Sequence, residues 1–555
     1  MSEDSKTAAQ FLIECLENEG VQYAFGIPGE ENLEILHALK KSKIRFITTR
    51  HEQGAAFMAD VYGRLTHKAG VCLATLGPGA TNLVTGVADA NGDGAPLVAI
   101  TGQVDTERIH LTSHQNVDLS KMFEPITKRT KVVVKPDTVN EIVRLAFKYA
   151  ESERPGATYI DFPVDISKNK VAIDSKPLKR EVPDKETAPV EKLEAAAAAI
   201  FKAKRPVILA GSQAIRSECS DSLTKFAESL KIPVINTMMA KGIIPCDNKY
   251  SMMTIGIPQK DYVNQLIEEA DTVIAVGYDL VEFSPAKWNK QNNHTIIHIS
   301  NRPAHINKSY QCTVQVVGDI SDSLRRVNMR VNREQEPTWA FKIKEEFWKL
   351  QEKYITDNSF PLKPQRILFD IRKVMGDDDI LISDVGAHKM WIGRLYECYQ
   401  PNTCIISNGF ASMGISVPGA FAAKLIYPDK KILAVTGDGG FMMNSQELET
   451  AVRNHINFVT IIFNDKNYGL IKWKEEDQYG EDFFVDFTNP DFVKLAEAMH
   501  CIGYRITKTE DFLPTLEKAF TQDAPVIIDV PVDYDENSKL SAELKAFAQH
   551  LQNQQ

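Results

Sequence analysis

The sequence lacks the features that would direct it to a membrane, to nucleic acid or to export. Its 555 residues contain no apolar run of the roughly 20 residues that a membrane-spanning helix requires. Its net charge is -10, whereas a nucleic-acid surface needs clustered Lys and Arg in excess. Residues 1–20 form an acidic amphipathic pattern instead of a basic end followed by an apolar segment. We therefore expect a cytoplasmic protein that binds neither nucleic acid nor membranes.

Cysteine is scarce and shows no ligand pattern. None of the eight cysteines is separated from another by two residues, and no group of them has the spacing of a zinc site. We therefore expect reduced thiols. The hydrophobic fraction of 43% and the charged fraction of 25% are typical of a globular protein, and 555 residues suffice for three or four domains.

The chain does contain a regular alternation of apolar strands and helical segments, which predicts an α/β fold. A further strand at 154–163 is followed by a stretch at 167–189 that is rich in Lys, Asp, Glu and Pro, which we interpret as a linker. Before it, residues 7–101 predict an open parallel sheet with strands at 22–25, 44–48, 71–75 and 96–100.

Two further α/β units follow the linker. A charged helix at 334–353 connects them, and the later unit opens with a helix at 364–375 and a strand at 380–383. The earlier unit begins with a helix at 190–204 and has predicted strands at 206–211, 234–236, 273–277 and 296–300. We therefore predict three doubly wound parallel-sheet domains, at residues 1–170, 190–333 and 355–540.

Two acidic residues follow successive strands of the last unit. The predicted strands at 432–435 and 458–463 flank a helix. A strand, a helix and a strand of this length form a right-handed parallel unit, so both strands end at the same edge of the sheet. Asp438 and Asp465 should therefore be neighbours, although either one alone would be an ordinary turn or loop acid.

Glycines surround the first of these acids, at Gly437, Gly439 and Gly440. Glycine allows backbone N–H groups to approach a ligand closely, and the positive end of the following helix favours an anion. Two carboxylates would repel that anion unless a hard cation lay between them, and Mg²⁺ suits such oxygen ligands. We interpret the turn as a metal-diphosphate clamp, and we expect Asn444 and Glu447 to cap the helix that follows.

Glu52 stands at the corresponding edge of the first unit. It precedes an apolar helix at 54–62, and we expect its side chain to be buried. A buried carboxyl has a raised proton affinity unless a cation faces it, which suits proton exchange with a ring nitrogen. On its own, an ordinary helix-start glutamate favoured by the helix dipole is the simpler interpretation.

The segments FGIPG, RHEQGAAFMADVYGR and GPGATN, followed far along the chain by GDGG, resemble the thiamine-diphosphate enzymes of the acetolactate synthase and pyruvate oxidase group. The resemblance implies that Glu52 hydrogen-bonds the aminopyrimidine of thiamine diphosphate. It also implies that the same pocket is lined by Pro28, Gly29, Thr75, Pro78 and Asn82.

The second half of the chain carries the matching diphosphate motif. In the family, GDG followed by a second acid or amide and a carbonyl two residues later holds the metal, which implies Asp438, Asp465 and the Asn467 carbonyl as ligands of Mg²⁺. The family's G-x-H-x-x-W turn is intact, and Met413 matches the bulky residue that wedges under the cofactor. The cofactor-binding residues implied in this half are Gly386, Ala387, His388, Ala411, Met413, Gly437, Gly439, Gly440, Tyr468, Gly469 and Leu470.

Gln115 lies in residues 110–128, which we expect to form a loop over the sheet edge. The H-Q form of this segment and the segment 276–289 are similar to catabolic acetolactate synthases. The resemblance therefore implies Gln115 as a second catalytic residue and no FAD. For the neighbouring His114, an ordinary loop role is the simpler interpretation.

The resemblance covers nearly the full chain and implies an acetolactate synthase, which joins two pyruvates to 2-acetolactate with loss of carbon dioxide. It also implies a homodimer or homotetramer with active sites shared between chains. Glu30, where the family has a small residue, and Lys474, where the biosynthetic enzymes have Trp, leave open a decarboxylase or carboligase of another 2-oxo acid. A pyruvate oxidase with bound flavin and a catalytically silent homologue also stay open, although Glu52, Asp438 and Gln115 argue against a silent protein.

Overall fold

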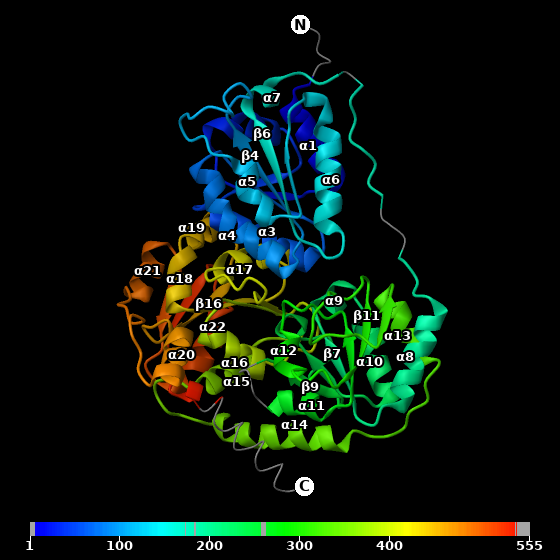
Figure 1. Cartoon of the computed structure of the whole chain (residues 1–555). Coiled ribbons are helices and arrows are strands. Elements are labelled where there is room, and N and C mark those ends of the chain that lie inside the picture. The colour runs from blue at the N-terminus through cyan, green and yellow to red at the C-terminus, as the bar shows by residue number, and fades with distance from the viewer. Residues whose placement is uncertain (1–5, 173, 182–184, 257–261, 539, 541–555) are drawn as a thin grey trace.

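Three six-stranded sheets follow one another along the chain, with helices packed against them (Figure 1). The computed structural model describes residues 6–172, 174–181, 185–256, 262–538 and 540. The α/β fold class predicted from the sequence is confirmed. Within those ranges, none of the helices combines the length and the apolarity of a bilayer-spanning segment.

The first sheet has the strand order β2-β1-β3-β4-β6-β5. Its strands are β1 (Tyr23–Gly26), β2 (Arg45–Thr48), β3 (Gly70–Ala74), β4 (Leu97–Gln103), β5 (Arg129–Val132) and β6 (Ala157–Pro163). The helices around it are α1 (Ala8–Glu19), α2 (Leu33–Leu39), α3 (Glu52–Thr66), α4 (Pro78–Asp93), α5 (Leu119–Phe123), α6 (Val139–Glu151) and α7 (Val164–Lys168).

The second sheet has the order β12-β11-β10-β7-β8-β9. Its strands are β7 (Pro206–Ala210), β8 (Val234–Asn236), β9 (Ser251–Thr254), β10 (Thr272–Val276), β11 (Thr295–Ser300) and β12 (Val314–Val317). Its helices are α8 (Val190–Lys202), α9 (Ser212–Arg216), α10 (Ser220–Leu230), α11 (Tyr262–Glu269), α12 (Pro285–Trp288) and α13 (Ile320–Asn328), and α14 (Thr338–Gln351) leads onward.

The third sheet has the order β14-β13-β15-β16-β18-β17. Its strands are β13 (Ile380–Ser383), β14 (Cys404–Ile406), β15 (Ile432–Gly437), β16 (Val459–Asn464), β17 (Ile502–Arg505) and β18 (Val526–Pro531). Its helices are α15 (Pro364–Val374), α16 (Ala387–Leu395), α17 (Ser416–Ile426), α18 (Asp438–Asn444), α19 (Glu447–Asn454), α20 (Gly469–Tyr479), α21 (Phe492–Ala498) and α22 (Phe512–Ala519).

The first and third units share one hydrophobic core. Helix α3 packs against α17, and Phe57 and Val61 of α3 belong to the same buried cluster as Ala420 and Phe421 of α17. Helix α3 is buried on nearly all sides, and its buried charged side chain Asp60 pairs with Arg64 at 2.6 Å. This packing places the start of α3, and with it Glu52, beside helices of the third unit.

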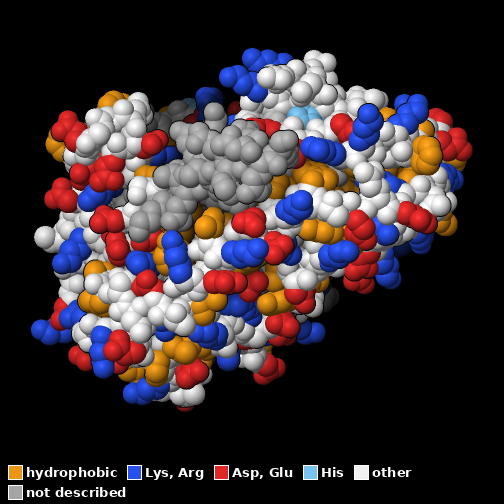
Figure 2. Space-filling view, turned by 90° about the horizontal axis from the view of Figure 1, so that it is seen from below, with side chains coloured by type: hydrophobic (Ala, Val, Ile, Leu, Met, Phe, Trp, Pro, Cys, Tyr) orange, Lys and Arg blue, Asp and Glu red, His pale blue; other side chains and the backbone are white. Residues whose placement is uncertain are grey.

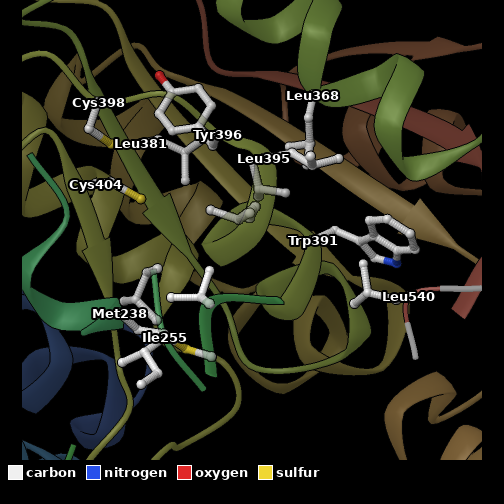
Figure 3. Close-up of a cluster of buried hydrophobic side chains, with 14 of the residues drawn as sticks. Met238, Ile255, Leu368, Leu381, Trp391, Leu395, Tyr396, Cys398, Cys404 and Leu540 are labelled. Carbon is white, nitrogen blue, oxygen red and sulfur yellow. The ribbon is translucent and has the colours of Figure 1, made fainter. Parts of the chain in front are cut away.

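The second and third units also pack together through apolar side chains. Met238 and Ile255 of the second unit lie in one cluster with Leu381, Trp391 and Leu395 of the third (Figure 3). On the face seen from below, Lys and Arg side chains alternate with Asp and Glu (Figure 2). This mixture of signs on that face agrees with the acidic net charge of -10 and offers no concentrated basic surface there.

Two local predictions are wrong. Residues 110–128 do not form a loop throughout, because α5 (Leu119–Phe123) and a short 3₁₀ turn at Glu124–Ile126 occupy their second half. Asn444 does not cap the helix that carries Leu448 and Ala451, since α19 is preceded by Gln446 as its N-cap residue and Asn444 is the last residue of α18.

Candidate active site

The predicted clamp at the third sheet brings two carboxyls close together. Asp438 begins α18, and Asp465 follows β16, the strand that pairs with β15. The buried Asp438 carboxylate accepts hydrogen bonds at its Oδ2 from the Lys466 backbone N–H and the Asn489 amide, both at 2.7 Å. Its Oδ1 accepts a third from the Gly439 N–H at 2.9 Å. These bonds fix the orientation of the Asp438 carboxylate.

The electrostatics of this pair suit a divalent cation. Burial raises the pKa of Asp465 to about 8, and the charge of Asp438 adds to the rise. Burial also raises the pKa of Asp438 itself. A cation between the two would stabilise both charged forms. The side-chain amide of Asn467 donates to the Asp465 backbone carbonyl at 2.6 Å, so Asn467 lies beside Asp465. The backbone carbonyl of Asn467 is the group that the sequence predicts as the third protein ligand of the metal.

The donor set also matches the chemistry of Mg²⁺. In the part of the chain that the structure describes, no three His, Cys, Asp or Glu side chains gather into a metal-binding group. A cation at Asp438 and Asp465 would therefore take two carboxylates, a carbonyl and further oxygens from phosphate and water. Mg²⁺ prefers this combination of few protein ligands and several non-protein oxygens.

His388 supplies an unpaired polar atom beside the clamp. The ring is buried, with 1% of the residue exposed, and its Nε2 has no hydrogen-bond partner among the described residues. Burial lowers the pKa of His388 to about 3, so the imidazole is neutral. A Cβ on Gly386 would lie 2.8 Å from His388 Cε1, and one on Gly437 would lie 3.5 Å away. In the neutral ring one nitrogen carries the proton, and in the tautomer with the proton on Nε2 this buried nitrogen, among glycines at the starts of α16 and α18, can donate to a diphosphate oxygen.

The other glycines of the clamp lie where a side chain would not fit. A Cβ on Gly439 would lie 2.9 Å from the ring of Tyr468, and one on Gly440 would lie 2.8 Å from Asp384 Oδ1. A Cβ on Gly469 would lie 2.5 Å from Asp465 Oδ2. The remaining predicted contacts of this half lie at element starts: Ala387 opens α16, and Leu470 lies in the first turn of α20, where it lines a cleft of about 1440 Å³.

Glu52 is the first residue of α3 and is buried as predicted, with 7% of the residue exposed. Its Oε2 accepts a hydrogen bond of 3.0 Å from the Asn82 amide. A Cβ on Gly79 would lie 3.3 Å from its Oε1, so the carboxyl also packs against the turn at the start of α4. Asn82 therefore restrains one oxygen of the carboxyl, while the other, Oε1, lies against Gly79.

The other residues predicted for this pocket lie on the same edge of the first sheet. Thr75 donates to Glu31 Oε2 at 2.7 Å, and a Cβ on Gly29 would lie 2.4 Å from Thr75 Cβ. Pro28 and Pro78 are exposed at the same edge. Glu31 was not among the predicted residues, because its role in holding Thr75 arises from a contact between two separate turns.

Gln115 is exposed and has a left-handed backbone, with φ of 56°. Its loop lies against the turn before α4, because a Cβ on Gly77 would lie 2.6 Å from the Gln115 carbonyl oxygen and 2.9 Å from its Cβ. The structure thus brings Gln115 to the turn that leads to Gly79 and Asn82, the neighbours of Glu52. Exposure leaves its amide free to reach a bound molecule.

Met413 lies in the turn between β14 and α17. Ala411 has a left-handed φ of 61° and Gly414 a φ of 90°. Asp384 accepts hydrogen bonds from the Gly414 N–H at 2.8 Å and the Ser416 N–H at 3.1 Å. The Met413 side chain is half-buried in this fixed turn. Sequence reasoning did not assign Asp384, whose partners are backbone groups about 30 residues away.

Glu447 is a second acid that sequence reasoning placed wrongly. Instead of taking part in a capping box at the start of α19, its Oε1 accepts hydrogen bonds from the backbone N–H groups of Arg50 at 3.1 Å and His51 at 3.0 Å. The Thr450 hydroxyl donates to its Oε2 at 2.7 Å. Burial raises the pKa of Glu447 to about 7. This carboxyl therefore joins the third unit directly to the turn that carries Glu52.

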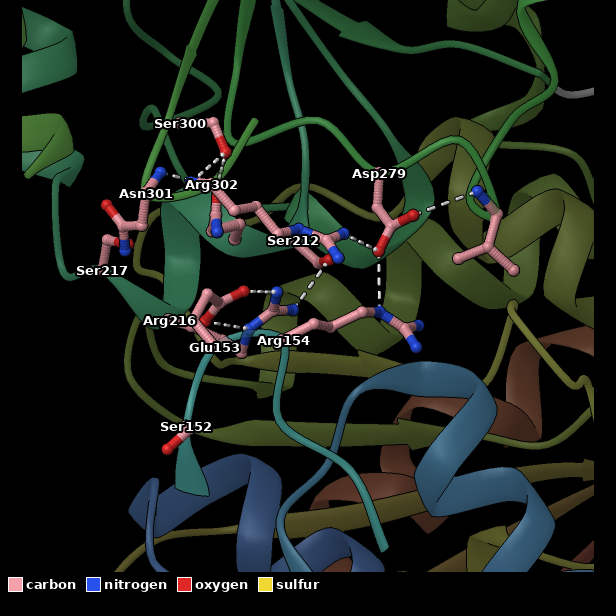
Figure 4. Close-up of polar contacts among 12 residues, drawn as sticks. Ser152, Glu153, Arg154, Ser212, Arg216, Ser217, Asp279, Ser300, Asn301 and Arg302 are labelled. Carbon is pink, nitrogen blue, oxygen red and sulfur yellow. Dashed lines mark hydrogen bonds and ion pairs between the residues drawn. The ribbon is translucent and has the colours of Figure 1, made fainter. Parts of the chain in front are cut away.

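The turn after β10, on which the expectation of no flavin rests, is bound by ion pairs. Asp279 contacts Arg154 at 2.7 Å and Arg302 at 2.9 Å, and Arg216 contacts Glu153 at 2.6 Å (Figure 4). Burial alone would raise the pKa of Asp279, but the two arginines outweigh it and lower that pKa. These contacts join the second unit to the chain that follows α6 of the first.

Comparisons with known proteins agree with this geometry over almost the whole chain. Residues 6–122 match the thiamine pyrophosphate enzyme N-terminal TPP binding domain, residues 193–327 the central domain and residues 384–530 the C-terminal TPP binding domain. An acetolactate synthase of Bacillus subtilis is 34% identical over 96% of this chain and 95% of the relative. A catabolic acetolactate synthase of Raoultella terrigena is 35% identical over 97% of each chain. A putative thiamine pyrophosphate-containing protein of Bacillus subtilis is 31% identical over 95% of this chain and 92% of the relative.

Proposed function

The chain belongs to the thiamine pyrophosphate enzyme family, and we propose on this basis that it is an acetolactate synthase that converts two pyruvates into 2-acetolactate and carbon dioxide. The observation that carries the proposal is the pair of Asp438 and Asp465 beside the unpaired Nε2 of His388. The chain that holds this pair is related along nearly its full length to two acetolactate synthases. We assign residues 1–170 to the pyrimidine end of the cofactor, 355–540 to its diphosphate and 190–333 to the domain between them.

Each group in the site has a chemical task in this proposal. Thiamine diphosphate, when bound, supplies an electron sink for the carbon that loses carbon dioxide. Asp438, Asp465 and the Asn467 carbonyl would hold Mg²⁺, and His388 in its Nε2-protonated tautomer would donate to a diphosphate oxygen. Glu52 exchanges a proton with a pyrimidine ring nitrogen through its Oε1, while Asn82 restrains Oε2.

The remaining groups position the reactants. Met413 supports the cofactor from the turn before α17, and the Gln115 amide orients the substrate from its loop. The cleft beside Leu470 and Lys474 admits the 2-oxo acid. Lys474 places a positive charge at its wall, which favours a carboxylate substrate.

We further propose that the active enzyme is a homodimer or homotetramer with shared sites. The hydrogen bonds of Glu52 and those of Asp438 involve separate sets of residues on different sheets. Large apolar side chains are exposed around them, including Met442 and Met443 of α18 at 44% and 42% and Leu33 at 56%. A second copy that covered these side chains would bring its own Glu52 to this clamp. The expected cytoplasmic location belongs to the same proposal, supported by eight free cysteines.

Product identification tests the proposed reaction. The purified protein is incubated with pyruvate, Mg²⁺ and thiamine diphosphate, and the products are separated. Acetolactate supports the proposal. Acetaldehyde would indicate a simple decarboxylase, and acetyl phosphate formed with a flavin absorption spectrum would indicate a pyruvate oxidase.

A further inference from the structure

The turn that carries Met413 is held by an acid from the first unit. Asp93, the last residue of α4, accepts hydrogen bonds from three consecutive backbone N–H groups of this turn. Its Oδ2 accepts from Asn408 at 3.2 Å, and its Oδ1 accepts from Phe410 at 3.1 Å and from Gly409. One buried carboxylate from α4 thus determines the path of the chain just after β14.

A second acid, one helical turn earlier on α4, holds both ends of the same turn. The Oδ1 atom of Asp89 accepts from the Ser407 hydroxyl at 2.8 Å and from the Ser412 backbone N–H at 3.1 Å. Asp89 is fully buried. Together the two carboxylates bind the turn from residue 407 to residue 412, immediately before Met413.

One arginine compensates both acids only in part. Arg64 of α3 contacts Asp89 at 3.0 Å and Asp93 at 2.6 Å, and it also contacts a third buried acid, Asp60, at 2.6 Å. Burial and the two other acids raise the pKa of Asp89 well above its usual range. Three carboxyls share this guanidinium, and the Lys389 ammonium interacts with Asp93 and Asp89 from the other side of the turn. The N–H groups of the turn add further stabilisation to the two acids.

Close backbone packing reinforces these hydrogen bonds. A Cβ on Gly409 would lie 2.3 Å from the Gly92 carbonyl oxygen, and a Cβ on Gly92 would lie 2.9 Å from Phe410 Cβ. Ala411 keeps its left-handed φ of 61°, which a residue with a side chain rarely adopts unless its surroundings impose it. Residues 407–412 are therefore held from the side of α4, while Lys389 binds the Ser407 carbonyl and Asp384 binds the N–H groups of Gly414 and Ser416 from the other side.

We propose that Asp89 and Asp93 are positioning residues that hold Met413 in place for cofactor binding. This inference rests on the proposed role of Met413 under thiamine diphosphate. Both oxygens of Asp93 accept from the turn, so an Asn there would place an NH₂ group against a turn N–H and the turn would lose an acceptor. Asp89 accepts from the turn with Oδ1 and from Arg64 with Oδ2, so an Asn there would place its NH₂ group against the guanidinium or, if flipped, against the Ser412 N–H. Each substitution would therefore loosen the hold of α4 on the turn. Met413 would then support the cofactor less well, although it remains chemically unchanged.

Asp60 provides a matched control. It is buried and belongs to the same charge cluster, and its carboxylate accepts hydrogen bonds from Arg64. It interacts with Asp89 but accepts no hydrogen bond from residues 407–412, so a change at Asp60 reaches the turn only through Asp89 and Arg64. Full-length Asp60→Asn, Asp89→Asn, Asp93→Asn and Met413→Ala proteins would be titrated with thiamine diphosphate and Mg²⁺ by calorimetry. We expect Kd to rise at least tenfold for the Asp89, Asp93 and Met413 variants and less than threefold for Asp60→Asn, even where all the Asp variants lose thermal stability.

A double variant separates positioning from general damage. If Asp93 acts through Met413, the two substitutions affect the same step of binding. The Kd of the Asp93→Asn, Met413→Ala double variant should then be no more than about twofold higher than that of the weaker-binding single variant. The proposal is overturned if Kd for Asp89→Asn and Asp93→Asn equals that of Asp60→Asn, or if the double variant multiplies the two losses.

A milder variant covers the case in which an Asn variant fails to fold. Ser407→Ala removes only the hydroxyl group that donates to Asp89. We expect the Kd of this variant for thiamine diphosphate to rise two- to fivefold. An unchanged Kd would count against the proposal. Calorimetry does not depend on the reaction product. If the unmodified protein binds the cofactor but forms no acetolactate, the proposed function is wrong. The Kd values of the variants still decide whether Asp89 and Asp93 position Met413.

Discussion

Glu447, at the start of α19, accepts a hydrogen bond of 3.0 Å from the backbone N–H of His51, the residue immediately before Glu52. The bond spans 396 positions of sequence and is buried between the first and third units. A carboxyl that follows Asp438 closely in the chain therefore restrains the backbone from which the proposed proton-transfer residue projects. Two predictions follow from this contact and its burial.

The stability of the protein should fall with pH through Glu447. Burial raises the pKa of this carboxyl from 4.5 to about 7. Between these values the folded protein keeps a proton that the unfolded chain has lost, so the free energy of unfolding decreases as pH rises from 4.5 to 7. The shift corresponds to a contribution on the order of 3 kcal/mol that is fully present below the pKa of the unfolded chain.

Urea unfolding between about pH 5 and pH 7.5 measures this slope. In Glu447→Gln, which cannot ionise, the slope should be flatter than in the unmodified protein. Glu497→Gln is the control, because Glu497 lies on another helix, α21, and its side chain is exposed. Equal slopes in the unmodified protein and Glu447→Gln would contradict the assignment.

Gly54 should be coupled to the same carboxyl. A Cβ on Gly54 would lie 2.6 Å from Glu447 Oε1, so Gly54→Ala should lower the free energy of unfolding by about 1–3 kcal/mol through overpacking. In a Glu447→Ala background the side chain that clashes is gone, and the same substitution should cost less. A double-mutant cycle by urea unfolding measures the difference, and strictly additive losses would rule out the contact as the cause.

Glu52→Gln should abolish turnover while leaving the cofactor bound. Gln can accept the hydrogen bond from Asn82 but cannot exchange a proton, and a lost general acid–base group typically reduces kcat by about 100-fold or more. The Kd for thiamine diphosphate should change by less than a factor of about 5, because the diphosphate clamp is untouched. Glu34→Gln on α2 is the control, and a Glu52→Gln protein with near-normal kcat would disprove the proposed role.

The sequence could predict those parts of the fold that lie in continuous apolar runs. β13, β15 and β16 are buried along their length and were found from the sequence apart from their ends. β5, β9, β12, β14 and β17 lie at sheet edges and were missed, as was β18. At an edge such as β5 or β17 the side chains are only partly buried, so no uninterrupted apolar run marks the strand.

The same distinction applies to the site. Asp438, Asp465 and Glu52 directly follow strands, so parallel topology alone places them at sheet edges. Glu447 and Asp93 could not be found this way, since their partners are backbone N–H groups more than 300 positions away. Backbone donors exist at almost every residue, and nothing in the local sequence tells which of them a carboxyl will meet in the folded chain.

Asp465→Asn should weaken Mg²⁺ binding and, with it, cofactor binding. The substitution removes one of two adjacent carboxylates, so the site loses half of the carboxylate charge that attracts a divalent cation. We expect the Mg²⁺ concentration needed for half-maximal binding of thiamine diphosphate to rise at least about tenfold, as removal of one charged ligand costs more than about 1.4 kcal/mol.

Asp482→Asn is the control, because Asp482 lies beyond α20 and contacts Lys472 at 3.9 Å on the surface. Calorimetric titrations at several Mg²⁺ concentrations measure the shift, and an unchanged Mg²⁺ requirement in Asp465→Asn would mean that the metal is held elsewhere.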